Sequence, residues 1–183
     1  MSCKAMEKFL SKENIEMHTE HAKMLSAGYS LKEKCYPQIK GKTLREISRI
    51  ALPKAEKEGV MKSNVYIFLH NLYFSSFAEV PKPSRCVRKY YGSEDKLCYE
   101  LLERARATDG DILMLALDRS GMPQILSYKD TPFAPLYYDV RLALDLYEHA
   151  YFFDYGFNRE GYLRQAIASL DLSRLDAPAE LGH

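Results

Sequence analysis

The sequence predicts an α+β protein, in which an N-terminal helical hairpin is followed by helices and a three-stranded antiparallel sheet. Residues 11–28 and 64–78 have the length and apolar spacing of helices. Residues 111–117 and 124–128 are dense apolar runs on either side of a turn-like DRSG segment. Two prolines in residues 80–84 exclude regular structure there, which predicts an N-terminal domain at 1–80 and a C-terminal domain at 84–183.

In the first half, Ser11 is a suitable N-cap for a helix that we expect to end near Gly28. A linker rich in lysine and proline then leads to a short amphipathic segment at 43–52, which Pro53 ends. The second long helix, at 64–78, completes the hairpin.

In the second half, the sequence predicts a helix over 93–107 and a β-hairpin formed by the two apolar runs. Residues 138–144 supply the third strand, and residues 160–170 return to helix.

Composition limits the classes of partner. The 183 residues are 46% hydrophobic and 28% charged with a formal net charge of +1, which suits one core or two small joined halves. The chain has no polybasic segment for nucleic acid or for a membrane surface, so we expect small partners. The first eight residues contain no apolar signal core, and no run approaches the roughly 18 apolar residues of a membrane span, so a cytoplasmic location is expected.

The four cysteines are scattered and form no C-x-x-C pair, which indicates neither a zinc ribbon nor a disulfide scaffold. Reduced, unreactive thiols are the expected state. They are Cys3, Cys35, Cys86 and Cys98.

Asp145 and His149 follow an apolar run and offer an oxygen and a nitrogen donor to one metal ion. A helix-capping pair is an equally good interpretation of these two residues alone. His18 lies on the apolar stripe of the first helix, and His70 lies in a segment almost without charge. A buried imidazole without a partner costs about 1–3 kcal/mol, so His70 is either a metal ligand or a core histidine bonded to a neighbour.

Together these segments resemble the iron/manganese superoxide dismutase family. The first helix, with LSKE leading to EMH, is similar to the family's first ligand helix, and HNLYF at 70–74 resembles its H-x-x-[FY]-W segment. YGSED at 91–95 resembles the F-G-S helix start of the family. DLYEHAY at 145–151 resembles its D-x-W-E-H-A-Y signature, and Asn158-Arg159 with Tyr162 resembles the N-R-x-x-Y run that follows. The resemblance implies one iron or manganese ion per chain, superoxide as substrate and a homodimer. The ligands that it implies are His18, His70, Asp145 and His149.

The chain departs from the family around this site. The family places a glutamine against the metal-bound solvent at one of two positions, which are Tyr66 and Lys129 here. The position of the family's gateway tyrosine is Ser26, and Tyr29, one helical turn further on, could substitute. Tyr73 matches the tyrosine of the iron-type pattern. Tryptophan is absent, and the resemblance would place it at Phe74, Ile112, Met114 and Tyr147, which keep the pocket wall apolar.

Four residues around the proposed site receive expected roles. Arg159, with Lys129, is expected to attract the superoxide anion, or alternatively to pair with a nearby acid. By the resemblance, Glu148 crosses a two-fold interface to hold the ligand histidine of the partner, whereas the alternative is that Glu148 caps the following helix through its own backbone. His21 is an alternative ligand to His18; with His18 as the ligand, His21 is an outer residue of the site or faces solvent.

Three functions remain open from the sequence. The leading one is a cytoplasmic superoxide dismutase, and the second is a metal-binding protein of the same fold with little or no dismutase activity. The third is a structural or interaction domain, for which the 14 tyrosines and 8 phenylalanines are weak support because such residues usually fill cores.

Overall fold

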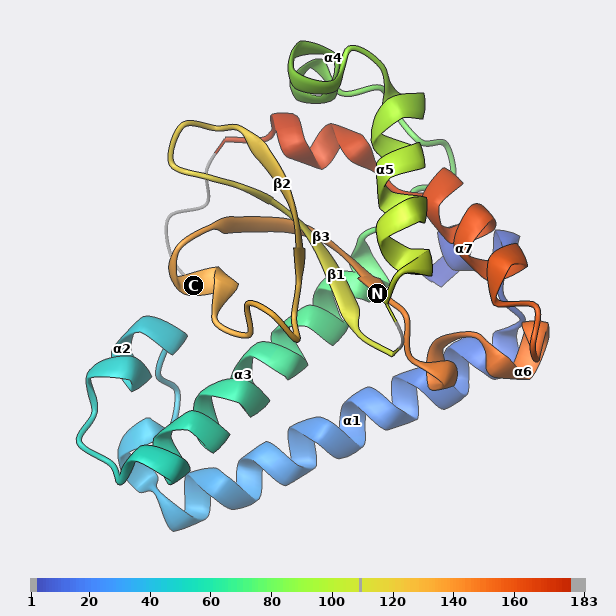
Figure 1. Cartoon of the computed structure of the whole chain (residues 1–183). Coiled ribbons are helices and arrows are strands. Elements are labelled where there is room, and N and C mark those ends of the chain that lie inside the picture. Colours follow the sequence, from blue (N-terminus) through green and yellow to red (C-terminus); the bar gives the residue numbers. More distant parts are fainter. Residues whose placement is uncertain (1–2, 109, 179–183) are drawn as a thin grey trace.

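The computed structural model describes residues 3–108 and 110–178 (Figure 1). Two long helices, α1 (Lys12–Cys35) and α3 (Lys54–Ser75), pack against each other as a hairpin, with the short α2 (Leu44–Arg49) at its far end. Ser11 caps α1 by accepting from the backbone N–H of Asn14, and Thr43 forms a capping box with Glu46 at the start of α2.

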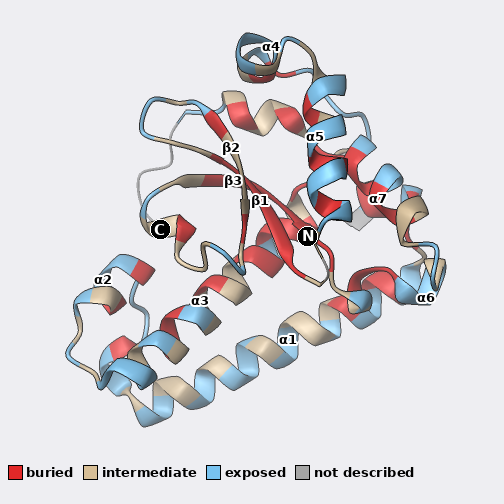
Figure 2. Ribbon diagram, in the orientation of Figure 1, coloured by how far each residue is buried: buried red, intermediate tan, exposed pale blue. Residues whose placement is uncertain are grey.

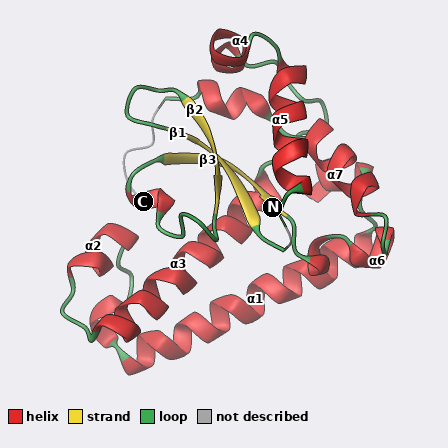
Figure 3. Ribbon diagram, in the orientation of Figure 1, coloured by secondary structure: helices red, strands yellow, loops and turns green. Residues whose placement is uncertain are grey.

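The second half contains a sheet with order β2-β1-β3, formed by antiparallel strands β1 (Ile112–Leu117), β2 (Pro123–Ser127) and β3 (Asp139–Asp145) (Figure 3). Helix α3 packs against β3, so the helical hairpin covers the sheet. Helices α4 (Arg85–Tyr91) and α5 (Glu94–Arg106) precede the sheet, and α6 (Phe152–Tyr155) and α7 (Arg159–Ala168) follow it. The fold class that the sequence predicts is confirmed.

Short 3₁₀ turns connect several of these elements. They lie at Cys3–Lys8, Pro37–Ile39, Ala134–Leu136, Glu148–Ala150 and Leu172–Asp176.

The core is continuous between the two halves. Residues 112–116 of the central strand are at most 2% exposed, because both faces of β1 are covered (Figure 2). Buried residues of α1, α3, the sheet and α7 join in one hydrophobic cluster. The division into domains at residues 80–84 stays a prediction.

Two predicted helix boundaries were wrong. Helix α1 continues seven residues beyond Gly28, which has an exposed helical backbone with space around it. The cost of a glycine inside a helix, about 1 kcal/mol, is offset because Lys32 bonds Gly59 O and Ser63 Oγ on α3. Helix α3 begins ten residues earlier than predicted, directly after Pro53, because Val60 and Met61 are buried by tertiary packing that the charged sequence does not reveal.

Other expectations on the fold are met within the described residues. The helix predicted over 93–107 is α5, capped by the Ser93 side chain, and the three strands lie within one or two residues of their predicted limits. Cys35, Cys86 and Cys98 are free thiols, whereas the side chain of Cys3 lies outside the described part. No helix of the described chain is long and apolar enough to cross a membrane.

Candidate metal centre

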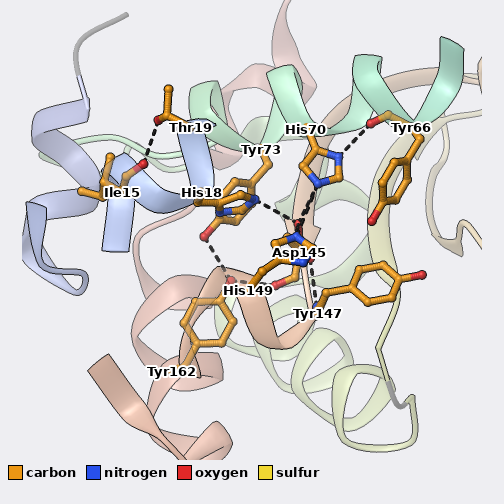
Figure 4. A network of polar contacts seen from close by, with 10 residues as sticks. All are labelled: Ile15, His18, Thr19, Tyr66, His70, Tyr73, Asp145, Tyr147, His149 and Tyr162. Atoms are coloured by element: carbon orange, nitrogen blue, oxygen red, sulfur yellow. Dashed lines mark hydrogen bonds and ion pairs between the residues drawn. The ribbon is translucent and has the colours of Figure 1, made fainter. Parts of the chain in front are cut away.

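Four side chains from four different elements converge at one point between the helical hairpin and the sheet (Figure 4). His18 comes from α1 and His70 from α3, while Asp145 is the last residue of β3 and His149 lies in the turn that follows it. One donor atom from each lies within 4.8 Å of the others. These are the four residues expected as ligands.

The distances between the donors match those imposed by a shared ion. Asp145 Oδ2 lies 3.2 Å from His18 Nε2, 3.4 Å from His70 Nε2 and 3.1 Å from His149 Nε2. The Nε2 atoms of His70 and His149 are 3.4 Å apart. Ligands bound to one ion at about 2.1 Å are about 3.0–3.6 Å from their neighbours, so the cluster is already close to the size that such an ion requires.

His18 provides the test of whether a metal fits. Its side chain is fully buried, yet neither ring nitrogen makes a hydrogen bond within residues 3–108 and 110–178, although Nε2 faces the Asp145 carboxylate. A buried polar nitrogen without a partner costs about 1–3 kcal/mol, and an ion bound at Nε2 would relieve this cost at that atom. Three imidazoles and one carboxylate suit a first-row ion such as iron or manganese.

The backbone orients two of the ligands. His70 Nδ1 lies 2.9 Å from Tyr66 O and donates to it, which leaves the lone pair of Nε2 facing the cluster. Asp145 Oδ1 accepts from the backbone N–H of Tyr147 at 2.9 Å, which leaves Oδ2 for the histidines. This bond closes the chain before the turn at Glu148–Ala150, whose N-cap is Tyr147 without a side-chain cap bond in the described structure, so Asp145 does not act as a helix cap.

A buried tyrosine pair holds the backbone of Asp145. Tyr162 donates from its hydroxyl to Asp145 O at 2.7 Å, and the hydroxyls of Tyr73 and Tyr162 are 3.1 Å apart. Because the single proton of Tyr162 is used on Asp145, Tyr73 is the donor within the pair. Both tyrosines are fully buried.

Burial and neighbouring groups set the protonation of the ligands. Burial alone would raise the pKa of Asp145, but the hydrogen bond from His149 and the proximity of His18 hold that pKa below its usual range. Burial lowers the pKa of His70 to about 4. At neutral pH the site therefore presents a carboxylate and a neutral His70, as metal binding requires.

Tyr73 and Glu148 lie beside the cluster, and Tyr29 lies further along α1. The Tyr73 ring is centred 4.9 Å from the His18 ring. Glu148 is exposed next to His149, and its backbone carbonyl accepts from the N–H of Tyr151 at 3.1 Å, so the alternative of a backbone cap stays open. Tyr29 accepts a hydrogen bond from Asn64 and is eleven residues from His18, about 16 Å along the helix.

Lys129 and Arg159 make hydrogen bonds to residues outside the four-donor cluster. The backbone N–H of Lys129 donates to Asp111 Oδ1 at 3.1 Å. The Arg159 guanidinium donates to Ala105 O at 3.0 Å and Thr108 O at 2.6 Å, at the end of α5. Arg159 thus joins α7 to α5 through carbonyls, instead of pairing with an acid as the alternative interpretation expected.

Aromatic rings form the wall of the site. Two of these rings stand where the resemblance would place tryptophan. The Phe74 ring is centred 4.9 Å from the His18 ring, and the Tyr147 ring is centred 5.6 Å from the His149 ring. Tyr66 meets His70 edge-on at 4.4 Å. Ile112 and Met114, the other two positions, are fully buried in β1.

His21 lies against two of the ligands, outside the four-donor cluster. Its ring is centred 4.3 Å from the His149 ring and 5.4 Å from the His70 ring. Its position three residues beyond His18, on a neighbouring part of the same helix surface, was the available signal.

Comparison with known proteins agrees with this geometry. The family model described as iron/manganese superoxide dismutases, C-terminal domain, matches residues 82–177. A relative named "Superoxide dismutase [Fe]" from Nostoc sp. (strain PCC 7120 / SAG 25.82 / UTEX 2576) is 26% identical over 143 residues, which cover 73% of this chain and 70% of the relative.

Proposed function

Because this chain belongs to the iron/manganese superoxide dismutase family, we propose that it is a superoxide dismutase that holds one iron or manganese ion. The proposed ligands are His18, His70, Asp145 and His149. The observation that carries the proposal is the convergence of these four donors together with the buried, unsatisfied nitrogens of His18, as far as the structure describes the chain. When bound, the ion supplies the one-electron redox chemistry of dismutation.

The surrounding residues have separate tasks in this proposal. Asp145 contributes the negative charge that partly balances the ion, and its carbonyl is fixed by Tyr162. The bond from His70 Nδ1 to Tyr66 O fixes the tautomer of one ligand. His149 has a side chain that is 28% exposed, whereas the other three ligand side chains are fully buried, so a small anion reaches the cluster at His149.

A second candidate is a metal-binding protein of the same fold with little or no dismutase activity. It is favoured by the residues at the two glutamine positions, Tyr66 and Lys129, and by Ser26 at the gateway position. Such groups tune the ion's potential and move protons in the family, so their replacement bears on activity more than on metal binding.

The deciding experiment is to load the purified protein separately with iron and with manganese. Superoxide consumption is then measured per bound ion. Activity with at least one metal supports the proposal, and a fully loaded protein inactive with both metals supports the second candidate. A protein that binds neither metal would leave a structural or interaction domain as the remaining function.

We further propose that the protein is a homodimer in which Glu148 accepts a hydrogen bond from the ligand histidine of the partner. Glu148 is exposed and adjoins His149 in the chain. Three phenylalanines that follow it in the chain are also exposed: Phe152 by 44%, Phe153 by 60% and Phe157 by 97%. Together they form an apolar surface of the kind that subunit interfaces bury.

A further inference from the structure

His21 lies at the edge of the cluster without belonging to it. Its ring packs on His149 at 4.3 Å with 32° between the planes, and on His70 at 5.4 Å. The four-donor cluster comprises other residues, so the contact of His21 with the site is through the rings of its ligands.

In the single chain, this edge is where the cluster is exposed. His149 has a 28% exposed side chain, and the remaining three ligands are fully buried. His21, itself half-buried, packs against that one exposed ligand. A small anion that enters the site therefore passes next to the His21 ring.

The Nε2 atom of His21 is buried and makes no hydrogen bond within the described chain. A buried polar nitrogen without a partner costs about 1–3 kcal/mol. A bound ligand that accepts a hydrogen bond from His21 Nε2 would remove this cost. Neither position at which the family carries its outer glutamine holds one here, since residues 66 and 129 are tyrosine and lysine.

We propose that His21 donates a hydrogen bond from Nε2 to the small anion that binds at the open edge of the metal cluster. The inference rests on the proposed function, in which that anion is superoxide. It makes His21 a catalytic residue that touches the substrate, whereas a residue that only packed on His149 would not affect anion binding.

Tyr66 is the competing donor. Its ring meets His70 at 4.4 Å, and burial raises the pKa of its phenol, so that it keeps its proton at neutral pH. His21 is favoured because it packs on His149, the exposed ligand, whereas Tyr66 packs on His70, which is fully buried.

Azide binding to the iron-loaded, oxidised protein tests the proposal without relying on activity. Azide is a small anion whose binding to ferric iron is followed by absorbance, and iron content is measured in parallel. His21→Leu, which keeps bulk but has no donor, should bind azide about tenfold more weakly, as expected for the loss of one hydrogen bond. His21→Gln, whose amide can donate, should stay within about threefold of the wild type.

Two further variants serve as comparisons. Glu20→Gln changes an exposed neighbour on the same helix, paired with Lys23, and should bind azide as the wild type does. Tyr66→Phe should have a smaller effect than His21→Leu. If the leucine variant does not fold, His21→Asn, whose amide is shorter, should show the weakened binding instead.

The proposal is overturned if His21→Leu binds azide like the wild type, if Tyr66→Phe alone weakens binding, or if His21→Leu loses its iron and so reveals a ligand. These outcomes are distinct from failure of the proposed function, which shows as an iron-loaded and manganese-loaded wild type that does not consume superoxide. A wild type that binds no metal would refute both.

Discussion

The side chains that fix Asp145 are as informative as the four proposed ligands. Tyr162 makes two hydrogen bonds in a fully buried position, as donor to Asp145 O and as acceptor from Tyr73. Tyr73 takes part only in the second of these hydrogen bonds, as its donor. The two hydroxyls are therefore not equivalent, because the loss of Tyr162 leaves two buried groups unsatisfied and the loss of Tyr73 leaves Tyr162 still bonded to Asp145.

We predict that Tyr162→Phe lowers the free energy of unfolding of the metal-free protein by about 2–3 kcal/mol, and Tyr73→Phe by about 1 kcal/mol. Urea denaturation of the two variants measures the difference. The double variant should lose less than the sum of the single losses, because the two residues share a bond. Equal losses in the two single variants would contradict this assignment of donor and acceptor.

At the scale of elements, α4 is held by a residue far along the chain. The Asp176 carboxylate accepts from Arg85 N at 2.8 Å, Cys86 N at 2.7 Å and the Ser84 hydroxyl at 3.1 Å. Burial would raise the pKa of Asp176, but these hydrogen bonds hold it below its ordinary value. The segment after α7 is thereby tied to the start of α4.

Asp176→Asn should lower the free energy of unfolding at pH 7 by about 1 kcal/mol, as for the loss of a helix cap. Since the pKa is lower in the folded state, the carboxylate stabilises the fold above its unfolded pKa near 3.9, and this contribution disappears as pH falls through the folded pKa. The difference between variant and wild type should therefore shrink below about pH 3.5. Thermal melts at pH 7 and at low pH measure it.

Asp130→Asn, an exposed aspartate in the turn after β2, is the control and should change stability little at either pH. A deficit of Asp176→Asn that stays constant down to low pH would argue against a charge-dependent cap.

At the scale of the molecule, local signals predicted the fold class and the strands because caps, apolar runs and turn residues act over a few positions. Ser11 forms the cap expected of it, and Ser93 caps the helix that was expected to start there. The true ends of α1 and α3 could not be predicted, since they depend on contacts such as Lys32 with Gly59, which are made across the hairpin.

The sequence predicts the proposed ligands of the candidate site better than it predicts the residues around them. The four ligands carry their own chemical signal and the family resemblance, and the structure brings them together. Tyr29 bonds Asn64 of α3 and Arg159 bonds the end of α5, and both contacts depend on tertiary packing. The position of His21 against His149 required the packing of α1 on the turn after β3.

The proposed dimer makes a further prediction for the whole molecule. The wild type should sediment as a dimer at micromolar concentration, and Phe153→Asp should sediment as a monomer because it places a charge in the apolar surface. Tyr99→Asp, at a position of similar exposure on α5, should remain dimeric, since Tyr99 and Phe153 are 64% and 60% exposed. Monomeric wild-type protein, or Glu148→Ala with unchanged dimer and metal affinity, would defeat the proposal.

The central claim is that one ion is held by His18, His70, Asp145 and His149, and metal content after loading with iron or manganese tests it most directly. Asp145→Asn and Asp111→Asn form a matched pair, because both aspartates are fully buried at the β1–β3 end of the sheet and Asp145 alone belongs to the cluster. Wild type and Asp111→Asn should retain about one ion per chain, and Asp145→Asn should lose most of it. A wild type that retains no metal, or an Asp145→Asn variant that retains a full complement, would contradict the account.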